Sequence, residues 1–557
     1  MRCRGCPGLG QMCVYMGKDR KMITISGQSI HKRLAIGKIL FMQADRPELC
    51  RATAENADAE LAAYQAAKAE VIGQLHELYK TAVDKVGELL AHTFEIHAMM
   101  IEDEAYSGMV ESMIRNEHVT AAYAVAATGR HYAQMLAQME DPFFQARSAD
   151  IREISNRLTD QLLGNHQESA ISEPVILMAE ELGPGETMQL DASLILGLVT
   201  HRGSENSHAA ILARTMNLPA ISGIAIREEW NGKLAVIDGE HGLLIVDPDA
   251  ETLAVYEDKL RAEKAKDEEL AALLPLPSET KSGVRVPLLC NVGCAADAAL
   301  AAELGADGIG LFRSEFLCLG GSEYPTEEEQ LAAYSNIVAT MQGRPVTIRT
   351  FDLGADKRAE FMHLPEERNP DLGFRAIRIS LAEEEPFRAQ LRAILRASAF
   401  GTVRVLYPMI SAEWEIRRVD EMFREEREKL TASGVAVGEV ERGIMIETPA
   451  AAIVCDRLAG YVEFFSIGTN DLTQYVLAAD RQNYAVAPYY NPRHEAVTRL
   501  IAHVVREAHS RGVSVCVCGE LAADVTATAE LVRMGVDFLS VAPNSLLAVK
   551  KAVRECE

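Results

Sequence analysis

The second half of the chain repeats one pattern eight times. Each repeat has a short apolar run, of the kind that forms a buried strand, followed by a segment with helical periodicity. The runs lie at 286–291, 308–313, 345–350, 403–408, 442–447, 464–469, 514–518 and 538–541. Eight strands with helical crossovers in residues 281–557 predict a (β/α)8 barrel, a fold that typically takes about 250 residues.

The first half of the chain is organised differently. Residues 22–44 alternate between apolar and polar side chains as strands do, and residues 166–250 contain short apolar runs separated by glycine. Residues 45–165 between them have helical periodicity, with one apolar face formed by Leu61, Tyr64, Val71, Leu75 and Leu78. We therefore expect a helical bundle inserted into an α/β domain.

Two smaller segments complete the expected domain order. Residues 251–280 are a charged segment that predicts a helical linker closed by Pro275 and Pro277. Residues 1–21 form a basic leader without the apolar middle region of a signal peptide. We interpret the leader as an atypical extension and Met22 as a plausible true start. Its Cys3 and Cys6 form one CxxC without a second pair, which is a weak indication of zinc.

Composition narrows the class of protein. A chain of 557 residues is too long for one ordinary core, and 48% apolar with 25% charged residues is typical of soluble globular proteins. The net charge of −25 argues against nucleic acid and anionic membranes as partners, and favours a cytoplasmic protein that could attract a basic partner. The sequence has no apolar run long enough for membrane insertion, and its eleven cysteines are too unevenly spaced for a disulfide framework.

Chemically active residues gather at the ends of the predicted barrel strands. Functional groups of such barrels lie at the C-terminal ends of the strands, and here these ends carry Asn291, Arg313, Arg349, Glu447, Asn470, Asp471 and Cys518. Two arginines offer planar donors for phosphate oxygens. Glu447 and Asp471 are hard oxygen ligands suited to Mg²⁺. The pattern predicts a site for a metal-bound phosphorylated carboxylate, with ion pairs that only stabilise the barrel as the alternative.

A second candidate is His208, within the segment GSENSHAAILAR at 203–214. Ser207 could cap a helix that begins near His208. The amino end of a helix favours a neutral imidazole and would stabilise a phosphoryl group on it. A lone histidine is more often structural, and the residues alone leave that alternative open.

The segment around His208 resembles the phosphohistidine motif of the enzyme I family of the bacterial phosphoenolpyruvate-dependent sugar phosphotransferase system. Other long motifs resemble the same family in the same order, from about residue 22 to the end of the chain. They are GIGLFRSEF at 308–316, PTEEEQ at 325–330, GFRAIR at 373–378, IETPAA at 446–451, SIGTNDLTQY at 466–475 and CGELA at 518–522.

The resemblance implies a multi-domain α/β protein. It would have a swivelling phosphohistidine domain (22–44 and 166–250), an inserted helical domain that docks the carrier protein HPr (45–165), a linker and a C-terminal TIM-type barrel (281–557) that binds phosphoenolpyruvate. It also implies a phosphotransferase that phosphorylates its own His208 at Nε2, passes the phosphoryl group to HPr, releases pyruvate and forms a homodimer through the barrel. Thr187 would orient the His208 ring.

The same resemblance assigns the barrel residues. Phosphoenolpyruvate would be bound by Arg313, Arg349, Arg375, Asn470, Asp471 and Arg481. Glu447 and Asp471 would hold Mg²⁺, and Cys518 would protonate the enolate. Spacing alone does not separate Cys518 from Cys516, which should share its face of the strand, and most free cysteines are simply buried apolar residues. The resemblance of the CGEL motif selects Cys518.

The sequence departs from the family pattern at two places. The histidine motif has Gly203-Ser204-Glu205-Asn206 where the family usually has Gly-Gly-Arg-Thr, and the turn between the first strands holds Ser29-Ile30-His31-Lys32 instead of small residues. The helical insert resembles the docking domain through FEIHAMMIEDE at 94–104. Within that segment we interpret His97 as structural, not as a second phosphoacceptor.

Two other functions would use some of the same domains or motifs. Pyruvate-phosphate dikinases and phosphoenolpyruvate synthases share both domains, but they need a large ATP-binding domain, and no glycine-rich phosphate loop precedes His208. A protein that only binds and senses would be expected to lose Cys518, Glu447 or an arginine, and all are present. A hinge near 251–280 is a further expectation, because one histidine must serve both the barrel and the partner.

Overall fold

The computed structural model describes residues 12–13, 22–42, 49–86, 88–139, 142–164, 171, 173–180, 182–183, 192–202, 209–210, 213, 216–318, 323–354, 357, 360–362, 364, 367–483 and 485–557. The chain divides into two compact units, Met1–Lys266 and Asp267–Glu557. The boundary falls inside one helix, α8 (Ala250–Ala271). None of the described helices is both long and apolar enough to cross a membrane.

The first unit contains a nine-stranded sheet in the order β1-β2-β9-β8-β4-β5-β6-β7-β3. Its central strands β4, β5 and β6 are parallel, and β5 is buried along its whole length, as strands covered on both faces are. The strands are β1 (Met12–Cys13), β2 (Ile23–Ser26), β3 (Gln28–His31), β4 (Leu34–Met42), β5 (Val175–Ala179), β6 (Ile195–Thr200), β7 (Ala220–Ser222), β8 (Leu234–Asp238) and β9 (Leu243–Val246).

Residues 28–31 correct the expectation of a turn at Ser29–Lys32. They form the edge strand β3, antiparallel to β7, and the chain turns after His31 instead. Two side-chain hydrogen bonds hold this strand, from the Ser29 hydroxyl to the Gly239 carbonyl and between His31 Nδ1 and the Leu218 carbonyl at 3.0 Å. The local sequence has no signal for these distant partners.

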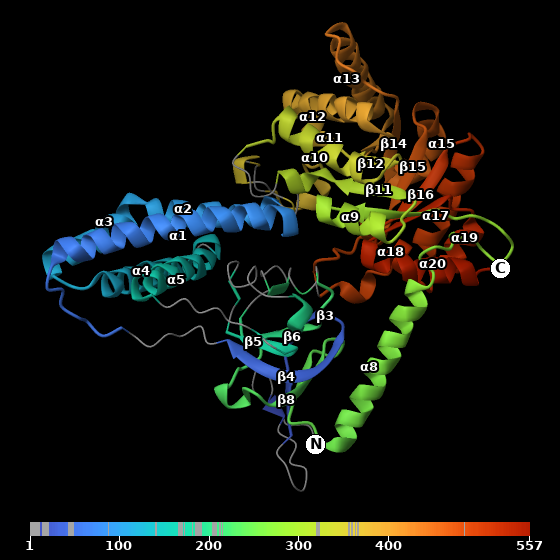
Figure 1. Cartoon of the computed structure of the whole chain (residues 1–557). Coiled ribbons are helices and arrows are strands. Elements are labelled where there is room, and N and C mark those ends of the chain that lie inside the picture. Colours follow the sequence, from blue (N-terminus) through green and yellow to red (C-terminus); the bar gives the residue numbers. More distant parts are fainter. Residues whose placement is uncertain are drawn as a thin grey trace. The chain divides into compact units, whose positions relative to one another are not determined.

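The helical segment interrupts this sheet, because β4 and β5 on either side of it are parallel neighbours. The segment forms five helices, in which α1 packs along α2 and α4 packs along α5 (Figure 1). Tyr64, Val71 and Leu75 of the predicted apolar face are fully buried, while Leu61 and Leu78 pack at the edge of the same core. The helices are α1 (Ala57–Val86), α2 (Glu88–Glu102), α3 (Glu104–Glu117), α4 (Ala121–Ala137) and α5 (Pro142–Leu163).

The second unit is a closed barrel of eight parallel strands, paired in chain order. The strands are β10 (Leu288–Val292), β11 (Gly308–Arg313), β12 (Val346–Arg349), β13 (Val403–Tyr407), β14 (Val440–Ile446), β15 (Phe464–Gly468), β16 (Ser514–Cys518) and β17 (Phe538–Val541). All eight predicted runs are strands, with ends that differ by at most two residues. The predicted fold class, an α/β domain with a helical insert followed by a TIM-type barrel, is confirmed.

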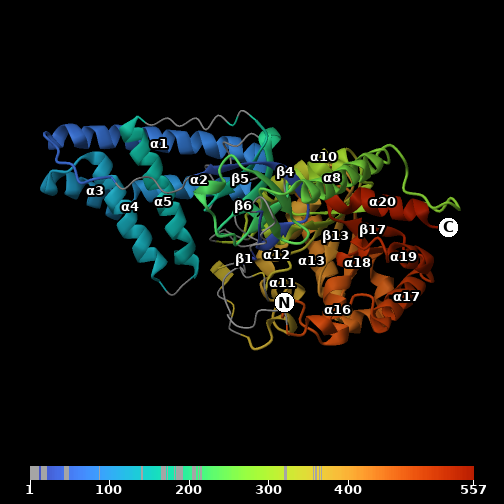
Figure 2. The same ribbon diagram turned by 90° about the horizontal axis from the view of Figure 1, so that it is seen from below.

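Helices surround the strands of the barrel (Figure 2). Apolar side chains from the strands and from the inner faces of these helices form one continuous core. The helices are α9 (Ala295–Glu303), α10 (Glu327–Thr340), α11 (Ile377–Ala382), α12 (Glu384–Ala397), α13 (Glu413–Ala432), α14 (Pro449–Ile453), α15 (Cys455–Leu458), α16 (Thr469–Leu477), α17 (Glu495–His509), α18 (Glu520–Ala523), α19 (Thr528–Met534) and α20 (Leu546–Glu555).

The segment predicted as a helical linker at 251–280 is helical only as far as Ala271. The chain then turns over residues 272–276 and enters a short bridge between Glu279 and Arg285. The two prolines of this region therefore lie beyond the end of α8 and not inside it.

Candidate functional site

The strand ends bring most of the predicted barrel residues to one mouth of the barrel. Arg313 ends β11 and is the direct neighbour of Arg349, which ends β12. Glu447 follows β14, and Cys518 ends β16 beside Gly468, the last residue of β15. Asn470 and Asp471 lie in the first turn of α16, immediately after Gly468. Because parallel strands end at one face, these groups share a single site.

Arg349 is held by acidic side chains that the sequence analysis did not single out. Its guanidinium pairs with Glu315 and, at 3.3 Å, with Asp352. Lys357 binds the same two carboxylates, with Nζ at 3.1 Å from Glu315 and 2.7 Å from Asp352. Burial lowers the pKa of Arg349, but Glu315 and Asp352 raise it more, so the net pKa lies above its ordinary value.

Arg313 is in a different situation. Its side chain is accessible to solvent, and it has no hydrogen bond or ion pair with the part of the chain that the structure describes. The surrounding protein and the neighbouring charge of Arg349 lower the pKa of Arg313. A charged, unpaired guanidinium beside a second arginine is a favourable place for an anion, because a bound phosphate or carboxylate would relieve the repulsion between them.

Glu447 is fully buried with an incomplete set of hydrogen bonds. Its Oε1 accepts a hydrogen bond of 2.6 Å from the Met409 backbone N–H, while Oε2 has no partner among the described residues. Burial raises the pKa of Glu447 to about 8, with further contributions from the negative charges of Asp471 and Asp352. A buried, unpartnered oxygen beside a second carboxylate is what a cation site requires, so these residues fit Mg²⁺.

The described residues contain no group of three or more His, Cys, Asp or Glu side chains that could hold a metal by themselves. The pair Glu447 and Asp471 would therefore supply only part of the coordination. This agrees with the usual coordination of Mg²⁺, which binds one or two protein carboxylates and completes its coordination shell with water and substrate oxygens.

Arg375 is a buried arginine that contacts one member of this acidic pair. Its side chain is 1% exposed and its guanidinium lies 3.0 Å from Asp352 and 3.5 Å from Asp471. It also donates to the Tyr475 hydroxyl at 3.2 Å. That Arg375 binds substrate stays a prediction; its two terminal nitrogens contact protein groups, while its Nε has no hydrogen-bond partner among the described residues.

Asn470 and Arg481 lie at the edge of the site. Asn470 Oδ1 accepts a hydrogen bond of 2.9 Å from the Glu520 backbone N–H, which leaves the amide nitrogen as its donor toward a ligand. The Arg481 backbone N–H donates to Gln474 at 3.0 Å, and its charge contributes to the lowered pKa of Arg313. Arg481 is therefore a further positive charge in the surroundings of Arg313.

The two cysteines of β16 both face the barrel interior but at different depths. Cys518 is 2% exposed and packs with Leu311, Leu406, Met445 and Phe464 at the level of the strand ends. Burial raises the pKa of Cys518 to about 11, so it is a protonated thiol at neutral pH. Cys516 lies two residues deeper and lines a small pocket with Arg404 and Phe538.

His208 and Thr187 lie outside the described residues, as do Gly203–Ser207. The structure does describe Ala209 and Ala210, which are helical and buried directly after His208. In the bundle, His97 is fully buried with Nε2 at 3.3 Å from Asp150, a setting that fits a structural histidine.

The residues missed by sequence reasoning are Glu315, Asp352 and Lys357. Glu315 and Asp352 lie two and three residues past the arginines that end their strands, which is a signal that could have been used. Lys357 has no such signal, because the loop that returns it to Glu315 and Asp352 follows no periodic pattern.

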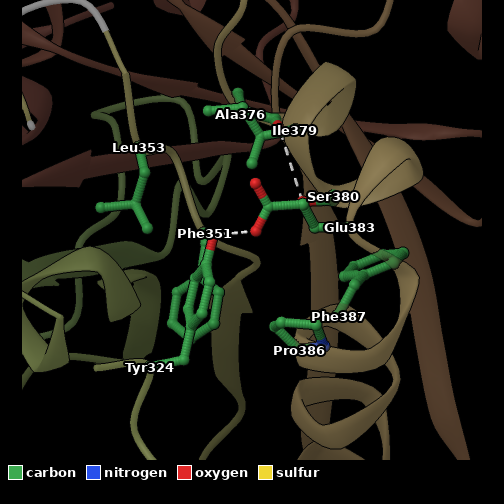
Figure 3. A pocket seen from close by; sticks show the side chains of 9 residues that line it. All are labelled: Tyr324, Phe351, Leu353, Ala376, Ile379, Ser380, Glu383, Pro386 and Phe387. Atoms are coloured by element: carbon green, nitrogen blue, oxygen red, sulfur yellow. Dashed lines mark hydrogen bonds between the residues drawn. The ribbon is translucent and has the colours of Figure 1, made fainter. Parts of the chain in front are cut away.

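A small pocket is lined by Phe351, Leu353 and Ala376, the chain neighbours of Asp352 and Arg375 (Figure 3). Phe387 lines it as well, and Tyr324 closes it with a hydrogen bond of 2.9 Å to Glu383. Its free space is about that of a water molecule. The pocket is therefore a packing feature that supports the site wall and not a substrate cavity.

Comparison with known proteins gives three family matches that together span most of the chain. Residues 26–147 match the N-terminal part of phosphoenolpyruvate-utilising enzymes, residues 171–242 match their mobile domain and residues 267–557 match their phosphoenolpyruvate-binding domain.

Curated relatives carry the name phosphoenolpyruvate-protein phosphotransferase. The relative from Geobacillus stearothermophilus is 39% identical over 545 residues, which is 97% of this chain and 94% of that protein. Those from Haemophilus influenzae and Bacillus subtilis are 39% and 37% identical, covering 95% and 96% of this chain and 93% and 94% of their own.

Proposed function

Because the chain belongs to the family of phosphoenolpyruvate-protein phosphotransferases, we propose that it moves the phosphoryl group of phosphoenolpyruvate first to its own His208 and then to the histidine of the carrier protein HPr. Pyruvate is the second product. The observation that carries the proposal is the meeting of Arg313 and Arg349 with Glu447, Asp471 and Cys518 at one barrel mouth. This set matches a small molecule that is at once a phosphate ester, a carboxylate and a latent enolate.

In this proposal the arginines hold the anionic groups of the substrate. Arg313 is the unpaired donor, Arg349 is oriented by Glu315 and Asp352, and Arg481 and the Asn470 amide complete the set. Arg375 keeps its predicted role at the substrate and also pairs with Asp471 at 3.5 Å, which helps to position that carboxylate. Fixed donors of this kind stabilise charge on a transferring phosphoryl group without reorganising during the reaction.

Glu447 and Asp471 are the proposed Mg²⁺ ligands, and the ion would neutralise phosphate charge when it is bound. The chain's own part in the transfer is the nucleophile and the acid. The P–O bond to the enol oxygen breaks as His208 Nε2 forms a bond to phosphorus, with Thr187 orienting the ring. The enolate then takes a proton at carbon from the Cys518 thiol, which burial keeps protonated.

The proposal assigns the helical segment of 45–165 to HPr docking and the barrel to homodimer formation, as the resemblance implies. The charge of −25 suits a carrier with a basic face and a cytoplasmic enzyme.

Intact-mass measurement tests the core of this proposal. The full chain incubated with phosphoenolpyruvate and Mg²⁺ should gain the mass of one phosphoryl group, and addition of HPr should move it to the carrier. The His208→Ala variant should gain nothing. A gain of the same size in His208→Ala would place the phosphoacceptor elsewhere.

A further inference from the structure

A buried hydroxyl lies against the proposed acid inside the barrel. Ser466 of β15 is 1% exposed, and its Oγ donates a hydrogen bond of 3.4 Å to Sγ of Cys518 on the neighbouring strand β16. In the sheet register Ser466 pairs with Cys516 and Gly468 pairs with Cys518, so Ser466 lies at the level of Cys516, two residues deeper in the barrel than Cys518. The hydrogen bond is therefore diagonal and reaches toward the mouth of the barrel.

The Cys518 thiol is fixed by two hydrogen bonds with opposite roles. It accepts from Ser466, and it donates its own proton to the Ile467 backbone carbonyl at 3.3 Å. The other side chains around it, Leu311, Leu406, Met445 and Phe464, offer only apolar contact or, in Met445, a weak acceptor. In such a setting a single hydroxyl donor has a large share in deciding where the sulfur points and how its charge is accommodated.

We propose that Ser466 is a positioning residue for Cys518, which holds the sulfur at the face from which substrate carbon is protonated and donates a hydrogen bond to the thiolate that remains. The proposal rests on the proposed role of Cys518. In the step itself the S–H bond breaks, a C–H bond forms at C3 of the enolate and the enolate oxygen becomes the ketone oxygen of pyruvate. The thiolate later takes a proton from water.

Several groups around Cys518 shift the pKa of its thiol, and the Ser466 hydroxyl is one of them. Burial raises the pKa of Cys518 to about 11, the Ser466 hydrogen bond lowers it, Glu447 raises it, and Arg349 and Arg313 lower it. Ser466, Arg349 and Arg313 come from strands β15, β12 and β11, and Glu447 follows β14. The neighbouring thiol on β16 is that of Cys516, whose pKa burial raises and a hydrogen bond from Ser466 lowers. Among the described side chains Ser466 is the neutral donor to the Cys518 sulfur, so loss of its hydroxyl should raise the pKa of Cys518 further.

The test follows hydrogen exchange at the pyruvate methyl group by NMR. Full-length enzyme, Mg²⁺, phosphoenolpyruvate and pyruvate are kept at equilibrium in D₂O, so each reverse cycle requires the thiolate to remove a methyl proton. Exchange should rise with pH as thiolate forms. In Ser466→Ala we expect the rise of the exchange rate with pH to begin about one pH unit higher than in the wild type. At pH values below that rise, the exchange rate should fall by up to about tenfold. Ser466→Thr, which keeps the hydroxyl, should recover most of the rate.

A matched control separates this role from loss of a buried hydroxyl in general. Ser540 of β17 is fully buried in the same barrel and donates to Asn291 at 2.6 Å, so Ser540→Ala should leave the pH profile unchanged. Cys518→Ser should lose exchange, and wild-type exchange in that variant would overturn the proposed acid itself. Two results would overturn the role of Ser466 alone. In the first, Cys518→Ser loses exchange while Ser466→Ala keeps the wild-type pH profile. In the second, Ser540→Ala shifts the pH profile as much as Ser466→Ala does.

Discussion

The carboxyl group of Glu447 couples metal binding to a proton. Its pKa is raised to about 8 by burial and by Asp471 and Asp352, so at pH 7 the metal-free protein holds this group mostly neutral. Mg²⁺ must displace that proton, and we expect its affinity to rise between pH 6 and pH 8. Calorimetric titration with Mg²⁺ in two buffers of different ionisation heat should show proton release at pH 7. The same titration of Glu447→Gln should show none, and equal release in both would contradict the assignment.

Loss of either proposed ligand should reduce activity. Glu447→Gln or Asp471→Asn should reduce phosphorylation by phosphoenolpyruvate by about a hundredfold or more, since charge on the transferring group is left uncompensated. Near-normal rates in both variants would remove these residues from the metal site.

Stability supplies an independent readout for the same group. The raised pKa of Glu447 means that its contribution to folding is complete below pH 4.5 and is lost as pH rises through about 8. Without metal, Glu447→Gln should therefore unfold at a higher temperature than the wild type at pH 9, while the two should be similar at pH 4.5. Thermal melts at the two pH values, with EDTA present, test this sign.

Cys518 and Cys516 offer a second test at this scale. Cys518→Ser should slow pyruvate release far more than it weakens phosphoenolpyruvate binding, because it replaces an acid and not a phosphate contact. Cys516→Ser should have the smaller effect, since this thiol lies two residues deeper and lines a pocket with Arg404 and Phe538. Single-turnover pyruvate formation separates the two variants, and a larger effect of Cys516→Ser would exchange their roles.

Sequence reasoning at the residue scale located side chains correctly where the end of a barrel strand fixes their position, while their roles stay predictions. Arg313, Arg349, Glu447, Asp471 and Cys518 could be picked out because each ends or follows a barrel strand. It failed for the charges that orient them: Lys357 reaches Glu315 across 42 positions of the chain, and Arg375 reaches Asp471 across 96. Such pairings depend on how loops fold back, for which no local periodicity exists.

Among the elements, the turns that follow β15 and β16 pack closely against each other at the site. Gly519 has φ +93°, and a Cβ there would lie 2.5 Å from the Thr469 hydroxyl and 2.8 Å from Asn470 Oδ1. Gly519→Ala should displace Asn470 and weaken phosphoenolpyruvate binding by about tenfold or more. Gly512→Ala is the control, because it has φ +73° and open space around the added carbon. If Gly519→Ala and Gly512→Ala lose the same amount of phosphoenolpyruvate affinity, backbone strain alone would explain the loss, and the contact with Asn470 would not be needed.

The elements themselves were largely readable from the sequence. Strands β10 to β17 are buried from both faces, so they appear as short apolar runs with definite ends. The first unit was harder at its edges. β1 (Met12–Cys13) lies in the predicted leader and pairs with β2, and β3 occupies an expected turn. Edge strands bury less apolar surface and depend on partners distant in the chain, so their local sequences carry little signal.

At the scale of the whole molecule, α8 is the element that belongs to both units. The part of α8 that belongs to the first unit is tied to the sheet by two side chains. The Tyr256 hydroxyl donates to buried Asp238 at 3.0 Å, and Glu263 pairs with Arg33 at 2.7 Å. Near its end, Glu269 pairs with Lys551 of α20 at 2.8 Å. The sequence predicted a charged linker here. It gave no sign that Tyr256, Glu263 and Glu269 attach this helix to other elements.

These anchors define where the chain can be divided to test the two-site mechanism. A fragment of residues 1–266 keeps Tyr256 and Glu263 with their partners, whereas a cut at residue 255 would remove both. We expect the fragment to fold, since the sheet and the bundle have cores of their own. Circular dichroism and a cooperative melt establish this before any assay.

If phosphoenolpyruvate binds only at the barrel, the folded fragment should take no phosphoryl group from phosphoenolpyruvate, even with Mg²⁺. It should still accept one on His208 from phosphorylated HPr, because that exchange needs only the histidine and the docking helices. Intact mass distinguishes the two reactions, and His208→Ala in the same fragment should abolish the second. Phosphorylation of the fragment by phosphoenolpyruvate would place the substrate site outside residues 267–557, and the arginines and carboxylates of the barrel mouth would then need another explanation.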